Sequence, residues 1–442
     1  MDHRRSTPVP DIRPGTATPP RRRRRAAALT AGLAAATLVL AGCGGPGGDD
    51  GDVTLRFVWW GSDARHQNTQ EIIDAFEAEH PHITINGDFG DWDGYWDQLA
   101  TQTAAADAPD IIQMDELYLR EYADRGSLLD LDQVDTSQMD ETVVDNGRTE
   151  GGLYGVTIGI NAFTILANPD LFDEAGVDMP DDTTWTWEDY RDIAVELSEN
   201  LDGAWGAGRF GETGGFQTWV RQQGGHLSDE DGQLGFTVED AESYFEYLVE
   251  LLEAGATPSA SALAEEQGVG PDQSLTAAGQ LAMCAWWSNQ SVALSESAGT
   301  QLELLRFPSH TGSAADAMPW YKSSMFLSGS ATTDHPEEVQ QFIDFFVNSE
   351  EAALIDMAER GIPPNNEIRQ VVTEELDGAQ LVMAEYIDEI EGELGPSEPV
   401  PAMGGSAFQQ ILYRYQDEVL FDRMSPADAA EAMVSEMESE IR

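Results

Sequence analysis

The order of strand-like and helix-like segments in the first part of the chain constrains its fold most. Residues 53–59 alternate between apolar and polar side chains, as in a strand, and residues 72–76 carry the apolar face of a helix. A second strand at 83–86, a second helix around 92–99 and a buried strand at 111–114 follow. Strands that alternate with helices pair in parallel through right-handed crossovers, so the sequence predicts an α/β fold.

The remaining elements favour more than one lobe. The longest strand-like run covers residues 152–167, and its Gly and Thr content suits a strand that passes from one lobe to the next. Residues 186–189 predict a capping box, with Trp185 and Tyr190 as its hydrophobic staple. Residues 281–287 predict another buried strand. About 400 residues downstream of the N-terminal segment are enough for two domains.

The N-terminal segment has the pattern of an export signal. Five arginines at 21–25 precede an Ala-rich apolar run that is shorter than the roughly 20 residues of a membrane-spanning helix. The run ends in Leu-Ala-Gly-Cys at 40–43, which resembles a bacterial lipobox. We expect residues 1–42 to be a signal peptide, Cys43 to be lipidated, and residues 43–52 to form a flexible tether. Sec and twin-arginine export both remain open.

Acidic residues dominate the composition. The formal charge is −58, and without residues 1–42, which hold eight Arg and two Asp, it becomes −64. Such a charge argues against nucleic acid and anionic lipid headgroups as partners. The acids are scattered and Lys322 is the only lysine, a pattern typical of salt-adapted surfaces; a cation-binding role is the alternative. Cys284 is the only other cysteine besides Cys43, so we expect no internal disulfide.

Aromatic and polar residues follow each of the first three predicted strands. Trp60 and Ser62 come after the first strand, Trp92 after the second and Asp115 after the third. Ligands of open α/β sheets bind beyond the carboxyl ends of the strands. We therefore expect these four residues to converge on one edge of the sheet and to contact a ligand.

Similar clusters occur in the second half of the chain. A pyranose ring stacks its apolar face on Trp or Tyr, and its hydroxyl groups need polar partners, so such clusters indicate a sugar site. A Trp is nevertheless more often part of a core, as we expect for Trp185 and Trp187. Trp286 and Trp287 point to opposite faces of a strand, and we assign Trp287 to the ligand. The clusters are Trp219 to Arg221, Trp286 to Asn289 and Trp320 to Lys322.

Several short motifs, taken in order and spacing, resemble one known family. The motifs are Trp59 to Ser62, Phe76 to Pro81, Ala108 to Asp115, Tyr154 to Asn161, Asn168 to Phe172, Trp185 to Glu188, His335 to Glu338 and Arg360 to Pro363. With these motifs, the chain is similar to the bacterial extracellular solute-binding proteins, family 1, of ABC sugar importers, the maltose-binding-protein-like group. The resemblance implies a two-lobed periplasmic-binding-protein-like fold (type II). Each lobe would be a mostly parallel sheet flanked by helices, and the ligand cleft would lie between the lobes.

The resemblance also implies a domain pattern and a set of ligand contacts. Lobe 1 would comprise residues 53–160 and 325–372, and lobe 2 residues 161–324, with the C-terminal helices at 373–442 packed on lobe 2. The implied partners are a small carbohydrate, permease subunits and the outer face of the membrane, reached through the lipid. We expect a monomer without cofactor or metal. The expected ligand contacts are Trp60, Ser62, Trp92, Asp115, Asn161, Trp219, Arg221, Trp287, Asn289 and Lys322.

Two other functional classes remain open. A secreted glycosidase would need two carboxylates roughly 5–10 Å apart, and an acid-rich chain offers many pairs. A polyamine or cation receptor would also suit the negative charge. The sequence contains no Gly-x-Ser-x-Gly, no His-Glu-x-x-His and no phosphate-binding loop. His80 and His82 fit a solvated helix end better than a metal site.

Overall fold

The computed structural model describes residues 51–441 except 62, 91, 150, 211–212, 230–231, 268, 270, 397, 400 and 402–403. The described residues group into one compact unit. The predicted signal peptide, Cys43 and the tether up to residue 50 lie outside the described residues. Of the helices that are described, none combines the length and the apolar character needed to span a membrane.

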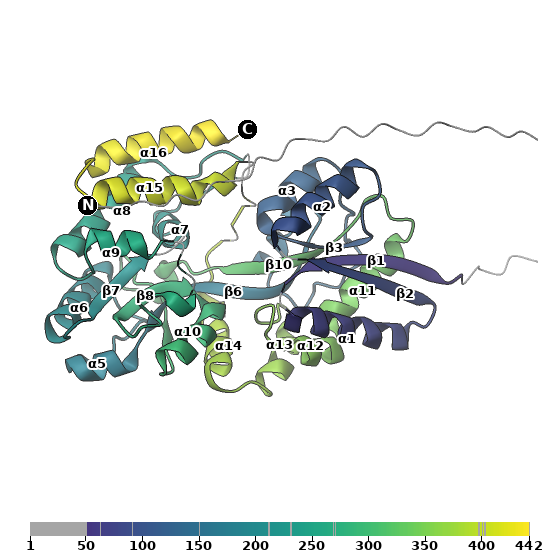
Figure 1. The fold of residues 1–442 in the computed structure, drawn as a ribbon, viewed down its shortest axis with the longest axis horizontal. Coiled ribbons are helices and arrows are strands. Elements are labelled where there is room, and N and C mark those ends of the chain that lie inside the picture. The colour runs from purple at the N-terminus through teal and green to yellow at the C-terminus, as the bar shows by residue number, and fades with distance from the viewer. Residues whose placement is uncertain are drawn as a thin grey trace, which may run out of the picture. The chain divides into compact units, whose positions relative to one another are not determined.

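Eight strands form a mixed sheet. Seven of them follow the order β2-β1-β3-β10-β6-β8-β7, and β9 pairs with β6 off this path (Figure 1). Strands β4 and β5 form a separate two-stranded sheet. The strands are β1 (Val53–Trp60), β2 (Ile83–Gly90), β3 (Ile111–Met114), β4 (Arg148–Thr149), β5 (Gly152–Leu153), β6 (Val156–Ala167), β7 (Trp205–Phe210), β8 (Leu281–Trp287), β9 (Glu303–Leu305) and β10 (Tyr321–Gly329).

Helices cover both sides of the sheet. In Figure 1, α2 and α3 lie on one side of β1 to β3, and α1, α11 and α12 lie on the other. The α-helices are α1 (Asp63–Glu79), α2 (Trp92–Ala104), α3 (Glu116–Asp124), α4 (Glu141–Asp145), α5 (Pro169–Ala175), α6 (Trp187–Asn200), α7 (Gly214–Arg221), α8 (Val238–Glu253), α9 (Ala260–Glu265), α10 (Ser291–Ala298), α11 (Pro336–Asn348), α12 (Glu350–Asp356), α13 (Asn366–Thr373), α14 (Gly378–Ile390), α15 (Phe408–Leu420) and α16 (Pro426–Glu440). The 3₁₀ helices are η1 (Pro271–Gln273), η2 (Ser288–Gln290), η3 (Ala314–Ala317), η4 (Glu391–Glu393) and η5 (Gly405–Ala407).

The parallel strand pairs lie toward the two ends of the sheet. Strand β1 pairs in parallel with β2 and β3, which confirms the prediction for the first three strands. Strands β7 and β8 are also parallel. In the centre, β10 runs antiparallel to β3 and to β6, and β6 runs antiparallel to β8. The fold is therefore α/β with a mixed sheet, because β6 and β10 cross its middle in opposite directions.

Strand β6 contributes to three hydrophobic cores. Val156 and Ile158 pack in the core around β1 to β3. Phe163 and Ile165 pack in the core that contains α6, α8 and β7. Ile160, between these pairs, packs in a third core with residues of α10 and α14. All twelve residues of β6 are buried, so the strand is enclosed along its whole length. A strand shared among these cores fits the expected passage from lobe to lobe, while the exact lobe boundaries remain predictions.

The predicted start of α6 is confirmed. Thr186 is the N-cap residue, and its side chain and that of Asp189 bond reciprocally to backbone N–H groups. The rings of Trp185 and Tyr190 lie 5.7 Å apart between centroids, as a hydrophobic staple requires. Local sequence therefore determines both where this helix begins and how the chain enters it.

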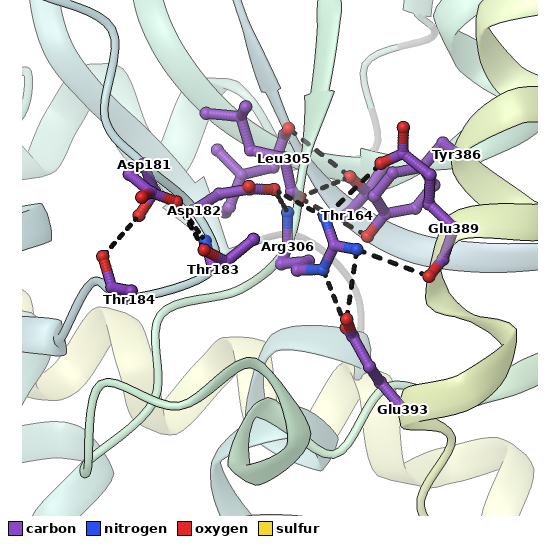
Figure 2. Close-up of polar contacts among 11 residues, drawn as sticks. Thr164, Asp181, Asp182, Thr183, Thr184, Leu305, Arg306, Tyr386, Glu389 and Glu393 are labelled. Atoms are coloured by element: carbon purple, nitrogen blue, oxygen red, sulfur yellow. Dashed lines mark hydrogen bonds and ion pairs between the residues drawn. The ribbon is translucent and has the colours of Figure 1, made fainter.

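An ionic cluster around the buried Arg306 joins segments that are distant in sequence (Figure 2). The Arg306 guanidinium donates from Nε to Glu393 at 2.7 Å and from Nη1 to Asp182 at 3.3 Å. Its backbone N–H donates to the same Asp182 carboxylate at 2.8 Å, and Glu389 lies 3.5 Å from Nη1. The cluster thereby fastens α14 and η4 to β9 and to the turn that precedes α6.

Candidate functional site

A cavity of about 180 Å³ lies where the beginnings of α3, β10 and α15 meet the end of β8. The position agrees with the rule that ligands bind beyond strand ends. Its described lining mixes aromatic rings with amide, hydroxyl and charged groups. The lining residues are Glu116, Leu117, Asn146, Thr213, Gln217, Leu227, Ser228, Trp287, Trp320, Tyr321, Lys322, Phe326, Glu398, Pro399, Pro401, Gly405, Phe408 and Gln409.

Two residues predicted as ligand contacts, Trp287 and Lys322, lie together in this lining. Lys322 Nζ is 2.8 Å from Oε1 of Glu116 and 4.9 Å from the centroid of the Trp287 ring. An ammonium group over an indole face is attracted by the π electrons of the ring. Trp287 also packs against Phe163, with 4.9 Å between ring centroids. One part of the cavity wall therefore combines an aromatic face with an ion pair.

Asp115 lies directly before this wall, at the N-cap of α3. Its Oδ1 accepts a hydrogen bond from the backbone N–H of Leu117 at 3.0 Å. Burial and, to a smaller extent, the adjacent Glu116 raise the pKa of Asp115, while Lys322 and the Leu117 N–H lower it, and the resulting pKa is about 6. Asp115 is outside the described lining, but its carboxyl group belongs to the same charged environment.

Arg221, at the end of α7, lies behind the wall instead of in the described lining. Its side chain is almost fully buried. It donates from Nε to the Met318 carbonyl at 3.0 Å and pairs through Nη1 with Glu398. Its guanidinium also lies 5.0 Å from the centroid of the Trp320 ring. Burial lowers the pKa of Arg221. Arg221 thus supports two lining residues, Trp320 and Glu398.

Two of the predicted tryptophans lie within hydrophobic cores. Trp60 is 8% exposed, and its ring packs 5.1 Å from that of Tyr95 between centroids. Trp219 is 5% exposed, its Nε1 donates to Ser243 Oγ at 2.9 Å, and its ring lies 5.1 Å from that of Trp187. Both residues stabilise the fold through these contacts, and neither belongs to the described lining of the cavity.

The other predicted contacts fall in different places. Asn161 is buried in β6 opposite Lys322 of β10, and its Oδ1 has no hydrogen-bond partner among the described residues. Asn289, in η2, is exposed. Ser62 lies outside the described residues. Trp92 is the first residue of α2. The structure thus brings Trp287 and Lys322 together, with Asp115 and Arg221 immediately behind them.

Several lining residues were absent from the prediction. Glu116 had a signal, because it follows Asp115 at the end of β3, and Trp320 lies in the cluster that includes Lys322. Glu398, Gln217 and Gln409 had none, because nothing in their sequence context separates them from other acids and amides. Only the folded chain brings α7, α15 and the segment after α14 to this cavity.

The chemistry of the cavity is that of a binding site with flat apolar faces and many hydrogen-bonding groups. The rings of Trp287 and Trp320 are nearly perpendicular, at 89°, with 6.1 Å between centroids. Amides, hydroxyl groups and carboxylates surround them. In the part of the chain that the structure describes, no group of three His, Cys, Asp or Glu residues is arranged to hold a metal ion.

Comparisons with known proteins identify the family of the chain. The sequence model of the family described as bacterial extracellular solute-binding protein matches residues 60–353. An uncharacterized lipoprotein of Streptomyces antibioticus is 31% identical over 190 residues, which are 41% of this chain and 40% of that protein. A putative binding protein of Brucella abortus is 27% identical over 132 residues, 29% of this chain and 31% of that protein. The chain thus matches at most two fifths of these relatives' length.

Solved structures share the fold over most of the chain. A family 1 extracellular solute-binding protein from Alicyclobacillus acidocaldarius is 26% identical, with a TM-score of 0.75, over 88% of this chain and 98% of that one. A periplasmic oligogalacturonide-binding protein from Yersinia enterocolitica is 21% identical, with a TM-score of 0.75 and the same coverage. The GacH receptor of Streptomyces glaucescens, solved unliganded and with acarbose, is 18% identical with a TM-score of 0.67, again over 88% and 98%.

The sequence model covers well over half of the chain, and the fold agrees with it. The chain belongs to the family of bacterial extracellular solute-binding proteins.

Proposed function

We propose that this solute-binding protein captures a small oligosaccharide in the cavity bounded by Trp287, Trp320 and Lys322, and delivers it to the permease subunits of an ABC importer. The observation that carries the proposal is the half-buried Trp287 ring in a lining rich in polar groups, with the buried Trp320 ring beside it. Sugar rings need both a flat apolar surface and hydrogen-bond partners for each hydroxyl. Two proteins with this fold, an oligogalacturonide-binding protein and a receptor solved in complex with acarbose, also support it.

Closure of the two expected lobes would couple ligand capture to transport. The cavity is lined by residues from α3, which packs near β1 to β3, and by residues from β8 and α15 in the other part of the unit. A ligand that contacts both walls binds the closed arrangement more tightly and shifts the population toward it. The permease would then recognise the closed form.

We also propose that Cys43 is lipidated and holds the protein at the outer face of the cell membrane. The lipobox supports this anchoring, and so does the similarity to a Streptomyces lipoprotein. A chain of charge −64 is repelled by anionic headgroups, so residues 43–52 would let it stand away from the surface. Cys43→Ser should move the protein from the membrane fraction to the culture medium, and continued membrane retention would contradict lipidation.

Calorimetry with neutral mono- to tetrasaccharides tests the carbohydrate proposal. We expect saturable binding, and a sugar at 100 times its dissociation constant should add about 2.7 kcal/mol to the free energy of unfolding. Trp287→Ala should weaken binding at least about tenfold, since a stacked aromatic face is lost. The matched control is Trp205→Ala, which removes a half-buried Trp of β7 outside the described lining. Hydrolysis of the sugar, or equal effects of both variants, would contradict the proposal.

The remaining predicted contacts stay predictions. Asp115 and Arg221 lie next to the described lining of the cavity, which favours an indirect role in binding. Asp115 would act through Glu116, and Arg221 would act through Trp320 and Glu398. If a residue contacts the ligand directly, its substitution by a smaller residue should lower the affinity for sugar without lowering the free energy of unfolding. The residues to be tested in this way are Trp60, Ser62, Trp92, Asn161, Trp219 and Asn289.

A further inference from the structure

The described lining of the cavity carries three charged side chains. Glu116 and Glu398 are acidic, and Lys322 is basic. Asp115, directly before Glu116, adds a third carboxyl group to this region. Behind the wall, Arg221 is buried. A ligand that enters the cavity therefore meets more carboxylates than cations.

Both cations are already matched to carboxylates. Lys322 Nζ lies 2.8 Å from Glu116, and Arg221 pairs with Glu398 while donating from Nη2 to the Pro396 carbonyl at 2.8 Å. A ligand carboxylate would have to displace one of these partners or remain next to a like charge. Because the side chains of Arg221 and Glu398 are 2% and 13% exposed, water cannot readily compensate a displaced charge there.

We propose that the cavity selects carbohydrates without negative charge, and that Glu116 and Glu398 exclude uronic-acid sugars while accepting neutral and amino sugars. The inference rests on the proposed carbohydrate function and names the substrate class. It separates this chain from the Yersinia protein of the same fold, which binds an acidic ligand, an oligogalacturonide. Like charges placed against each other in an interface oppose binding and thereby determine specificity.

The wall itself contains an example of how an amino sugar would be held. The Lys322 ammonium lies both against Glu116 and over the face of Trp287, at 4.9 Å from the ring centroid. A sugar ammonium could also meet Glu398, which lines the cavity together with Trp320 and whose Oε1 contacts Arg221 and, at 3.3 Å, His226. Carboxylate and aromatic face together favour a cation and disfavour an anion.

Matched sugar triplets test the proposal. Calorimetry would compare oligosaccharides built from glucose, glucosamine and glucuronic acid, and the corresponding galactose series, at neutral pH and constant ionic strength. We expect neutral and amino members to bind and the uronic-acid members to bind at least about tenfold more weakly. A uronic-acid member that binds as tightly as its neutral counterpart would overturn charge selection and leave the carbohydrate function intact. Failure of all three classes to bind would overturn both.

Glu116→Gln identifies the responsible group. The change keeps the shape of the side chain and removes one negative charge beside Lys322, so the ratio of neutral to uronic-acid affinity should fall at least about threefold. The matched control is Glu121→Gln, a carboxylate of the same helix that pairs with Arg125 at 2.7 Å. Glu398→Gln would leave the buried Arg221 unmatched and can prevent folding, so Glu116 carries the test. An unchanged ratio in Glu116→Gln would overturn its assigned role.

Discussion

Arg306 and Arg221 are both buried arginines paired with carboxylates, yet their environments differ in kind. Burial lowers the pKa of Arg306, but hydrogen bonds to Glu393 and the charge of Asp182 outweigh it, so the pKa is raised. Burial lowers the pKa of Arg221, which has Glu398 as its carboxylate partner. The fold therefore favours the charged form of one arginine and disfavours that of the other.

The location of each cluster explains the difference. The Arg306 cluster lies away from the cavity, where three carboxylates join α14 and η4 to β9 and stabilise the fold (Figure 2). Arg221 lies behind the cavity wall and holds Trp320 and Glu398 in place. Burial next to the cavity thus disfavours the charged form of Arg221, and perturbed groups of this kind are common at functional sites.

The largest effect is expected for Arg306→Met. The substitution leaves Asp182 and Glu393 next to each other without their cation, and should lower the free energy of unfolding by about 3 kcal/mol. Urea denaturation measures the change. Arg414→Met is the control, because its pair with Glu436 is half-exposed and should contribute less than about 1 kcal/mol. Sugar affinity should remain unchanged, and a loss of affinity in Arg306→Met would contradict its purely structural role.

Arg221→Met, unlike Arg306→Met, should lower the affinity for sugar as well as the stability of the fold. Affinity for the bound sugar should fall at least about tenfold, or about 1.4 kcal/mol, because Trp320 and Glu398 lose their support. The free energy of unfolding should fall by about 2 kcal/mol, less than for Arg306→Met, since burial already disfavours this charge.

The double variant Arg221→Met with Glu398→Gln separates the effect of Arg221 on sugar affinity from its effect on stability. Removal of the unpaired carboxylate should restore most of the stability, because apolar replacement of a buried ion pair is often neutral. Affinity should stay low, since the position of Trp320 is still unsupported. Recovery of affinity together with stability would show that Arg221 acts only on folding.

Asp115→Asn tests how the carboxyl group of Asp115, beside the cavity, affects the free energy of unfolding as pH changes. The pKa of Asp115 is about 6 in the folded chain and about 4 in an unfolded one, so the folded state binds more protons between these values. Its contribution to stability is therefore lost as pH rises toward 6 and above. Asn is an equally good N-cap residue. The unfolding free energy of Asp115→Asn, relative to the parent, should be about 1 kcal/mol higher at pH 7.5 than at pH 5.0; equal differences would contradict the raised pKa.

Local sequence was sufficient for much of the fold. Alternation along β8 separates Trp286, whose Nε1 donates to Thr276 at 3.1 Å, from Trp287, which lines the cavity. Hydrogen bonds between near neighbours explain why the cap at Thr186 could be predicted. The antiparallel centre of the sheet could not be predicted, because it depends on where β10 returns after more than 150 residues.

The site was less predictable because burial is a property of the whole fold. An aromatic residue after a strand suggests a ligand platform, but Trp60 and Trp219 are enclosed by other aromatic side chains from α2 and α8. Glu398 shows the converse problem. Its segment looks like any acidic loop, and only the approach of Arg221 from α7 makes it part of the cavity.

Lys322→Met should have the smallest effect on stability. Lys322 and Glu116 each keep 29% of their side chains exposed, so their ion pair should contribute less than about 1 kcal/mol to folding. Met preserves the aliphatic contact with Trp287 while removing the ammonium. Denaturation should therefore change little, whereas calorimetry should show weaker sugar binding. A loss of stability as large as that of Arg306→Met, with unchanged affinity, would make this pair structural and remove the distinction between cavity-side charges and those that hold the fold.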